Sequence, residues 1–236
     1  MICIGVKTRE IALSEKNELI AIISSSVHDM KAPLMSISGF AEAMLDGTIS
    51  KENHEKYLSV IRDEAARMQR ICEELLEASR IETGTACYKN DSFDICESAR
   101  RVLLSFEKDV EKKQLEVSFD APEEGIEVVF DQSSLVRVLY NICENAVKFS
   151  YEKGYIHISF EENDEHMVIR IENSGDGISA DELDRIFLPF YKSGALAGTG
   201  LGLFIVKRIL EAQGASISAE SILGRSMAFV VKIRRR

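Results

Sequence analysis

Apolar or small residues in the first part of the chain recur at alternating steps of three and four, the spacing of a helix in a bundle. One such column consists of Leu19, Ile23, Ser26, Met30, Pro33, Ile37, Phe40 and Met44. A second apolar column beside it consists of Ile20, Val27, Leu34 and Ala41. A stripe of this width favours a four-helix bundle over a two-stranded coiled coil. We therefore predict a helix from about Ser14 to Leu45, after a short lead-in at residues 1–13.

A second amphipathic segment predicts another long helix. Asp46 and Gly47 end the first helix, because glycine is the usual residue at a left-handed helix end, and Ser50 is placed to cap the next. The apolar column of this next helix consists of Leu58, Ile61, Ala65, Met68, Cys72, Leu75 and Ser79. The two helices form an antiparallel hairpin at residues 14–82. One hairpin cannot cover both apolar stripes, so we expect it to form a four-helix bundle with a second copy.

The helical period is lost at residues 83–92, which we interpret as a linker, and a different pattern occupies residues 93–236. Helical spacing predicts helices near residues 95–112, 132–148 and 200–213. Short alternating segments predict strands at Leu115–Asp120, Ile126–Asp131, Tyr155–Phe160, Met167–Glu172, Ile217–Glu220 and Met227–Ile233. Helices mixed with antiparallel strands indicate a two-layer α/β sandwich, so the predicted fold class is α+β.

The composition excludes several classes of protein. The chain of 236 residues is 45% hydrophobic and 29% charged, as in soluble globular proteins. A net charge of −10 argues against nucleic-acid binding, because no basic excess can neutralise phosphates. The five cysteines form no Cys-x-x-Cys pair, which is typical of a reducing compartment. No segment approaches the ~20 apolar residues that span a bilayer, so we expect a cytoplasmic chain.

The first helix carries a histidine in the segment HDMKAPL. His28 falls on neither apolar column and is expected to face water, with Asp29 next to it. Such an imidazole can serve as a nucleophile or general base, but a histidine is also an ordinary residue on an exposed helix, and spacing does not decide between the two. Pro33 removes the hydrogen bond that the carbonyl of Asp29 would accept, which predicts a kinked or loosened turn.

Three polar residues share one face of the helix predicted after Asp131. Asn141, Asn145 and Lys148 stand at i, i+4 and i+7. Two amide oxygens one turn apart can hold a hard cation, and a lysine one turn further can meet phosphate. The spacing alone still favours a simple solvated face, although asparagine is mildly unfavourable within helices.

Two glycine-rich segments follow along the chain. Gly175 and Gly177 come directly after a strand and permit either a tight turn or the close approach of a flat ligand. Phe187 and Phe190 then lead to a second cluster at residues 194–203, which opens a helix whose free amides suit anionic phosphates. Each glycine cluster alone is weak evidence for a ligand-binding site, and the order of the segments along the chain is more informative.

In this order the motifs resemble those of two-component sensor histidine kinases over about residues 14–233. The segment around His28 resembles the phosphoacceptor box, residues 141–150 resemble the asparagine box, and the glycine and phenylalanine segments match the remaining boxes in order and spacing. Five ordered motifs make the resemblance specific. It implies a dimeric helical-hairpin domain that carries the histidine and forms a four-helix bundle, followed by a Bergerat-type ATP-binding sandwich.

The resemblance also implies a role for each matching residue. His28 would accept the phosphoryl group, Asp29 would take the proton of His28, and Asn145 with Asn141 would hold Mg²⁺. Further residues would bind ATP, with lysines at the phosphates, Phe149 beside the nucleotide and the first glycines around adenine. These residues are Lys148, Phe149, Asn173, Gly175, Gly177, Lys192, Gly198, Thr199, Gly200, Leu201 and Gly202. The small residues at 193–197 would form a short mobile lid.

The implied reaction transfers the γ-phosphoryl group of ATP to His28 and then to an aspartate on the receiver domain of a response regulator, with catalysis by positioning and charge neutralisation. The implied partners are this receiver and a second copy of the chain. No sensor module is recognisable ahead of Ser14, so the input would come from a partner or from the remainder of a longer protein, such as a membrane sensor.

Three positions depart from the family pattern. Asn173 stands where an aspartate usually reads adenine, and a neutral acceptor is expected to weaken nucleotide binding without ending it. Ala32, four residues after the histidine, replaces a threonine, serine or asparagine, and predicts weak phosphatase activity. Lys31 replaces an arginine and keeps its charge.

Two other functions compete with the kinase. ATPases of the gyrase, heat-shock-chaperone or mismatch-repair type place a water-activating glutamate where this chain has Asn141, which cannot act as a base. A non-enzymatic phosphotransfer hub with a decayed ATP pocket agrees with Asn173, but the intact glycines and asparagines disfavour it. The signal, the cognate receiver and the choice between transfer within or between subunits do not follow from the sequence.

Overall fold

The computed structural model describes residues 2–192 and 199–235, with side chains from residue 23 onward except residue 25. The chain forms two compact units. Residues up to Ala86 form most of the first, and residues from Cys87 onward form most of the second. The division lies inside the segment that the sequence marks as a linker.

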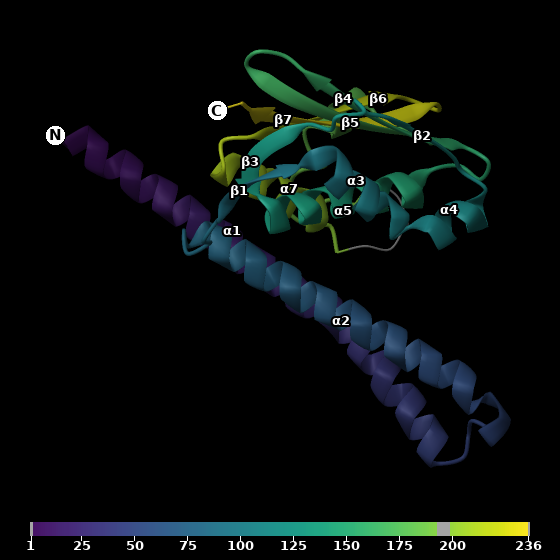
Figure 1. Cartoon of the computed structure of the whole chain (residues 1–236). Coiled ribbons are helices and arrows are strands. Elements are labelled where there is room, and N and C mark those ends of the chain that lie inside the picture. Colours follow the sequence, from purple (N-terminus) through teal and green to yellow (C-terminus); the bar gives the residue numbers. More distant parts are fainter. Residues whose placement is uncertain (1, 193–198, 236) are drawn as a thin grey trace. The chain divides into compact units, whose positions relative to one another are not determined.

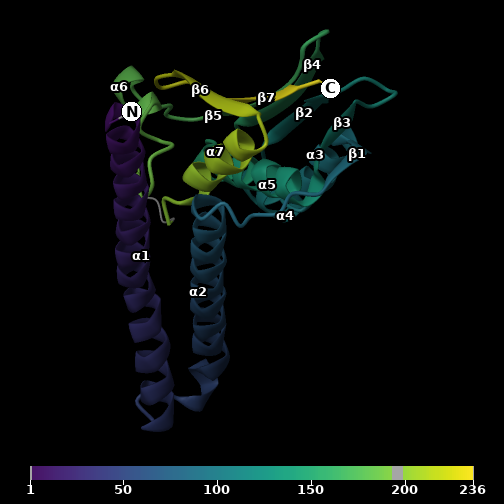
Figure 2. The ribbon, with the colours of Figure 1, turned by 90° about the vertical axis from the view of Figure 1, so that its left-hand side faces the viewer.

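Two long helices form the first unit (Figures 1 and 2). Helix α1 spans Ile2–Leu45 and helix α2 spans His54–Glu82, with a short 3₁₀ turn, η1, at Lys51–Asn53. Helix α1 ends where the sequence predicts but begins at Ile2, so residues 2–13 of the predicted lead-in are helical. Residues 2–13 contain no proline that would stop the helix. Helix α1 also continues through Pro33.

The turn between the helices begins as predicted, but the start of the second helix differs from the prediction. Gly47 has a φ of +80°, as expected for a left-handed helix end. The side chain of Ser50 makes no capping hydrogen bond, and its Oγ instead accepts from Nδ2 of Asn53 at 3.0 Å. The predicted cap at Ser50 is therefore wrong, because the 3₁₀ turn intervenes and moves the start of α2 to His54.

Both apolar columns of α1 keep exposed side chains, although the first, which includes the exposed Ile23, is partly buried. In the first column Ser26 is only 1% exposed, and the ring of Phe40 lies 5.0 Å from that of Tyr57 on α2. In the second column Val27 and Leu34 remain 59% and 51% exposed. One hairpin thus leaves apolar side chains in water, as expected of a helical pair that is completed by another copy.

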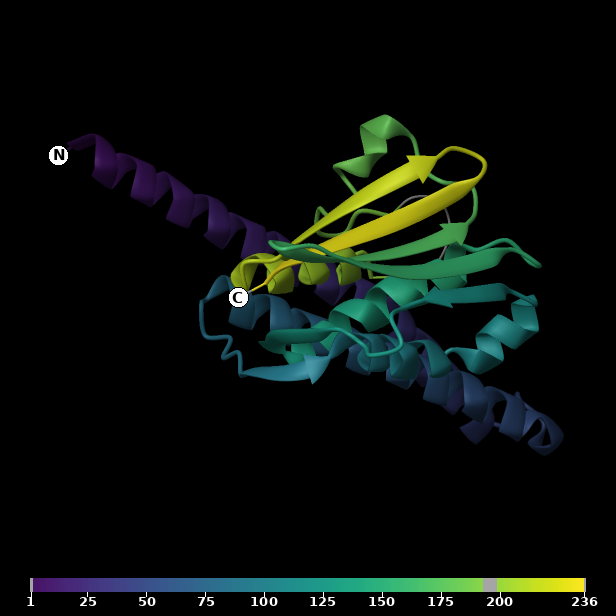
Figure 3. The same cartoon turned by 45° about the horizontal axis from the view of Figure 1, so that its top comes forward.

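The second unit is a five-stranded sheet with helices on one face (Figures 1 and 3). The order of its strands is β2-β4-β5-β7-β6, and all neighbours are antiparallel except β2 and β4, which are parallel. The strands are β2 Glu116–Asp120, β4 Tyr155–Glu162, β5 His166–Ser174, β6 Ser216–Ile222 and β7 Ser226–Arg234. The helices are α3 Ile95–Leu104, α4 Glu107–Lys113, α5 Gln132–Phe149, α6 Ala180–Leu183 and α7 Gly202–Ala212. The predicted α+β class is confirmed.

The core of this unit lies between the sheet and its helices. Alternate residues of β4 and β5, such as Ile158 and Ile169, are fully buried, which matches the period of two of a strand with one covered face. Helix α5 buries Leu135, Leu139 and Ile142 at helical spacing. This packing fixes the direction of the opposite, polar face of α5.

Two local predictions are wrong. The helix predicted near 95–112 is divided into α3 and α4, because the chain turns at Phe106, whose ring is buried and lies 4.8 Å from that of Tyr140. The end of the predicted linker is a strand, β1 Asn90–Asp94, which pairs with β3 Glu127–Asp131 in a separate two-stranded sheet. Strand β1 is mostly polar, so no apolar alternation marks it in the sequence.

Asp131 caps α5. Its carboxylate accepts hydrogen bonds from the backbone of Ser134 at 2.8 Å, from Oγ of Ser133 at 2.7 Å and from the backbone of Lys89 at 2.9 Å. Burial opposes the ionised form, but these hydrogen bonds outweigh it and lower the pKa of Asp131 to about 2.

We expect Asp131→Asn to lower the free energy of unfolding by about 2 kcal/mol at neutral pH. Because the pKa of Asp131 is lower in the folded chain than its ordinary value of 3.8, its contribution is complete above 3.8 and is lost as the pH falls toward 2. Urea unfolding of both chains at neutral pH and near pH 2 measures this difference. Asp109→Asn on the exposed face of α4 is the control, and equal losses at both pH values contradict the prediction.

Candidate functional site

His28 lies on the solvent face of α1. Its side chain is 86% exposed, and its Nδ1 lies 3.6 Å from Oδ1 of Asp29, which is 20% exposed. Ser26 and Pro33 on this helix are buried, whereas Ala32, one turn beyond the histidine, is exposed. The predicted outward direction of the imidazole is therefore observed, with a carboxylate on its Nδ1 side.

The polar face of α5 lies against the start of α7. Nδ2 of Asn141 donates to the carbonyl of Arg137 at 2.9 Å, which fixes the orientation of the amide. Its Oδ1 faces Gly202, where an added Cβ would lie only 2.8 Å from that oxygen. Asn141 and Gly202, which are 61 residues apart in sequence, are thus brought together, and a glycine is required at the contact.

Two lysines from different motifs lie close enough to influence each other. Burial lowers the pKa of Lys148, Glu144 opposes this, and the positive charge of Lys192 lowers it further. The ammonium of Lys148 also lies 4.9 Å from the centre of the Phe149 ring. Two cations held near each other form a region that favours an anion such as a polyphosphate.

The first glycine segment packs against the end of α5. Asn173 is 1% exposed, and its Nδ2 donates to the carbonyl of Ser174 at 2.7 Å. A Cβ on Gly175 would lie 2.6 Å from the carbonyl oxygen of Phe149, so no larger residue fits there. Gly177 has a φ of +63°, which favours glycine.

The second glycine segment packs against the phenylalanine motif. The backbone of Phe190 donates to the carbonyl of Gly200 at 2.9 Å, and a Cβ on Gly200 would lie 2.7 Å from Cα of Phe190. Leu201 is fully buried, and Phe187 is buried. Thr199 lies just ahead of this contact, whereas Gly198 and the predicted lid at 193–197 lie outside the described residues.

Sequence reasoning missed a further contact of this region. The hydroxyl of Tyr151, two residues after α5, donates to Asp176 in the first glycine segment at 2.6 Å. This hydrogen bond, together with burial, raises the pKa of the phenol. The two residues are 25 positions apart and follow no common period, so no signal in the sequence connects them.

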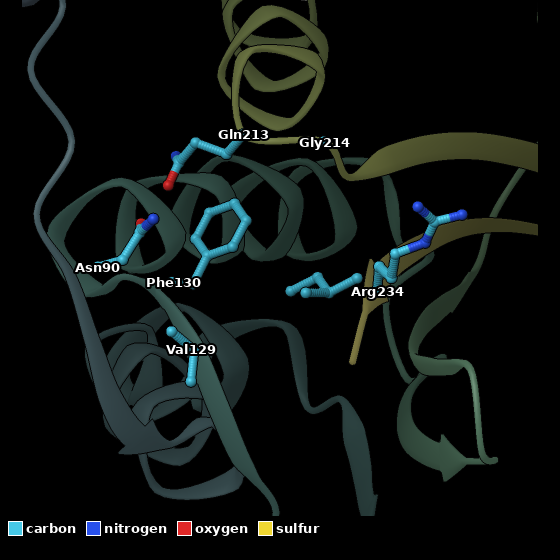
Figure 4. A pocket seen from close by; sticks show the side chains of 7 residues that line it. Asn90, Val129, Phe130, Gln213, Gly214 and Arg234 are labelled. Carbon is cyan, nitrogen blue, oxygen red and sulfur yellow. The ribbon is translucent and has the colours of Figure 1, made fainter. Parts of the chain in front are cut away.

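A cavity of about 220 Å³ occupies a different part of the second unit (Figure 4). It is lined by Asn90, Val129, Phe130, Gln213, Gly214, Ile233 and Arg234. Gln213 is engaged in the fold, because its Oε1 accepts from the backbone of Asp131 at 3.2 Å. None of the sequence-predicted site residues lines this cavity.

Two further properties hold for the described residues. Within the part of the chain that the structure describes, no group of three or more His, Cys, Asp or Glu side chains could hold a metal ion. Over the same residues, no helix combines the length and the apolar character that crossing a membrane requires.

Comparison with known proteins agrees with this fold. Residues 15–84 match the family described as the His Kinase A (phospho-acceptor) domain. Residues 130–236 match the family of histidine kinase-, DNA gyrase B- and HSP90-like ATPases. The two units are therefore a phosphoacceptor hairpin and an ATPase-type domain.

The chain belongs to the two-component sensor histidine kinases and comprises the core of such a protein. The sensor protein SrrB of Staphylococcus aureus strain MRSA252 is 28% identical to it over 224 residues, which cover 92% of this chain. The chain spans only 38% of the length of that relative.

Two solved structures have the same fold. The Acinetobacter baumannii histidine kinase AdeS has a TM-score of 0.76 at 24% identity, covering 89% of this chain and 98% of that one. The histidine kinase ThkA, solved in complex with the response regulator protein TrrA, has a TM-score of 0.79 at 24% identity, covering 98% of this chain and 66% of that one.

Proposed function

We propose that this chain transfers the γ-phosphoryl group of ATP to His28 and passes it on to an aspartate of a response regulator. The observation that carries the proposal is the imidazole of His28, 86% exposed on α1, with a carboxylate 3.6 Å from its Nδ1. Its family and the contacts between its asparagine and glycine motifs support the proposal. Incubation with γ-labelled ATP tests it. A protein-bound label that survives alkali but not acid is expected, and the absence of such a label contradicts the proposal.

The position of Asp29 favours one nitrogen of His28 as the nucleophile. A carboxylate on the Nδ1 side favours the tautomer with its proton on Nδ1, which leaves the lone pair of Nε2 as the nucleophile. The bond between Nε2 and the γ-phosphorus forms as the bond from that phosphorus to the leaving oxygen of ADP breaks. The proton on Nδ1 then passes to Asp29, which neutralises the imidazolium.

The polar face of α5 suits Mg²⁺-ATP. Mg²⁺ keeps several waters and phosphate oxygens and needs only one or two oxygens from a protein, which the amides of Asn145 and Asn141 provide. When bound, Mg²⁺ would offset the charge that develops on the phosphates. Lys148 and Lys192 would contact the phosphates, and Phe149 would flank the nucleotide.

The base of the nucleotide would lie near Asn173, Gly175 and Gly177, while Gly198, Thr199, Gly200, Leu201 and Gly202 would surround the phosphates. A side chain at Gly175 would collide with the carbonyl oxygen of Phe149, so glycine keeps this loop close to the end of α5. Nδ2 of Asn173 is already engaged with Ser174, which leaves its Oδ1 as the acceptor for an adenine amino group. Calorimetry with ATP separates an active kinase from a hub without a working pocket, because only the kinase binds the nucleotide.

Two partners complete the proposal. A second copy of the chain would cover the exposed apolar side chains of Val27 and Leu34 and form a four-helix bundle. The response regulator is supported by membership of the family and by ThkA, a kinase of the same fold that was solved with such a protein. We place this reaction in the cytoplasm, where ATP is available.

We expect weak phosphatase activity toward the phosphorylated receiver, because Ala32 has no donor or acceptor to orient a water near His28. Ala32 is exposed one helical turn after the histidine, on the same side of α1. Ala32→Thr is therefore expected to increase dephosphorylation without changing the labelling of His28. The measurement follows loss of phosphate from purified phosphorylated receiver in the presence of ADP.

The matched control is Ala66→Thr, which makes the same change on the exposed face of α2. This control is expected to leave dephosphorylation unchanged. The prediction fails if the unmodified chain already dephosphorylates the receiver rapidly and Ala32→Thr adds nothing.

A further inference from the structure

A lysine from a neighbouring helix caps the last turn of α5. Lys113, the final residue of α4, donates from Nζ to the carbonyl oxygens of Val147, Lys148 and Ser150 at 2.8, 2.8 and 3.0 Å. An ammonium has three protons, so the three carbonyls satisfy it completely. These carbonyls lie at the end of a helix, where they have no partner within the helix and where a cation meets the negative end of the dipole.

The backbone next to Lys113 strengthens this junction. The carbonyl of Lys113 accepts from the backbone of Lys153 at 2.8 Å, and the backbone of Glu116 donates to the carbonyl of Gly154 at 2.9 Å. The segment after α4 is thus hydrogen-bonded to the turn after α5. Lys113 contacts this turn with both its side chain and its backbone.

The opposite side of the same turn faces the first glycine segment. Gly175 approaches the carbonyl of Phe149, and Tyr151 donates to Asp176. The end of α5 is therefore held on one side by an ammonium and on the other by the loop that follows β5. Between these two restraints lie Lys148 and Phe149.

We propose that Lys113 is a positioning residue for nucleotide binding, which holds the backbone of Lys148 and Phe149 so that their side chains meet ATP. The proposal rests on the proposed function. Without the ammonium, three carbonyl oxygens at a helix end lose their hydrogen-bond donor and must bind water instead. The last turn of α5 then opens more easily. The two nucleotide-contacting side chains then lose their fixed backbone, and affinity for ATP falls.

A cation of similar size can replace this ammonium if its charge and its three contacts are what matter. An ammonium ion can donate hydrogen bonds to carbonyl oxygens, and a potassium ion can coordinate them directly, as it does in carbonyl-lined filters. Tetramethylammonium has the same charge but no proton to donate, and its methyl groups keep the charge away from carbonyl oxygens. Chemical rescue therefore distinguishes the capping cation from simple packing of the lysine stem.

The test compares Lys113→Ala with Lys112→Ala, its exposed neighbour on α4, in the full chain. Calorimetry measures binding of a non-hydrolysable ATP analogue with tetramethylammonium chloride as the added salt, and again with ammonium or potassium chloride at equal ionic strength. We expect Lys113→Ala to bind about tenfold more weakly than the control, since supporting residues of a site cost about this much. Ammonium or potassium ions should recover most of the loss, whereas the rate of labelling at saturating ATP should change little.

Affinity of Lys113→Ala equal to that of Lys112→Ala, or a loss that ammonium and potassium do not repair, overturns the positioning role. If Lys113→Ala does not fold, Lys113→Met replaces it, and affinity equal to that of the control then overturns the role. Failure of the unmodified chain to bind ATP contradicts the proposed function as well. If the unmodified chain binds ATP but His28 is not labelled, the proposed function is contradicted and the positioning role of Lys113 is not.

Discussion

Replacing His28 with alanine is expected to abolish autophosphorylation and to leave ATP binding unchanged. Alanine has no nitrogen that could form a bond to phosphorus, so we expect autophosphorylation to be lost completely rather than reduced. His28 is exposed on α1 and has no role in the core, and its removal should leave the hairpin intact. The label from γ-labelled ATP should therefore vanish, while calorimetry gives the affinity of the unmodified chain.

The control for this experiment is His166→Ala. His166 lies on β5, is 37% exposed and has Glu165 at 3.9 Å, so it offers an accessible imidazole beside a carboxylate outside the phosphoacceptor segment. This variant should label normally. Label that persists on His28→Ala, or that disappears from His166→Ala, would assign the phosphoacceptor to another residue.

Asn145→Asp is expected to reduce autophosphorylation by a factor of about 10²–10³, the usual effect of disturbing one group that stabilises charge in a transition state. The two side chains have nearly the same size, but aspartate adds a negative charge on the face of α5 that would hold Mg²⁺ and the triphosphate. Repulsion between like charges then opposes the productive position of the γ-phosphate. Initial rates of labelling at saturating Mg²⁺-ATP measure this effect.

Asn163→Asp is the matched control for this change. Oδ1 of Asn163 accepts from the backbones of Glu165 and His166 at 3.0 and 2.8 Å in the turn after β4, and an aspartate can accept both bonds equally well. The control adds the same charge and should label at the normal rate. Near-normal labelling of Asn145→Asp would remove Asn145 from the site.

Contacts between distant parts of the chain explain why some local predictions failed. The helix predicted near 95–112 has adequate helical spacing, but burial of Phe106 against Tyr140 divides it into α3 and α4. Strand β1 has no apolar alternation and exists because β3 pairs with it. Sequence periodicity cannot report either contact, since both depend on a partner that lies elsewhere in the chain.

The same difference between local pattern and tertiary contact holds for the motifs that we propose to bind the nucleotide. The sequence by itself determined that Asn141, Asn145 and Lys148 share one face of a helix, because the period of 3.6 residues is a local property. It also determined the outward direction of His28 and the positions of the glycines. Only the tertiary structure decided that Asn141 meets Gly202 and that Gly175 meets the end of α5.

The cap that Lys113 places on α5 belongs entirely to the tertiary structure. A lysine at the end of a short charged helix has no distinguishing pattern, and the three carbonyls that it binds are backbone atoms that every sequence possesses. Periodic side chains thus determine which elements form and which faces they bury. The backbone groups that remain at the ends of those elements find their partners only when distant elements pack together.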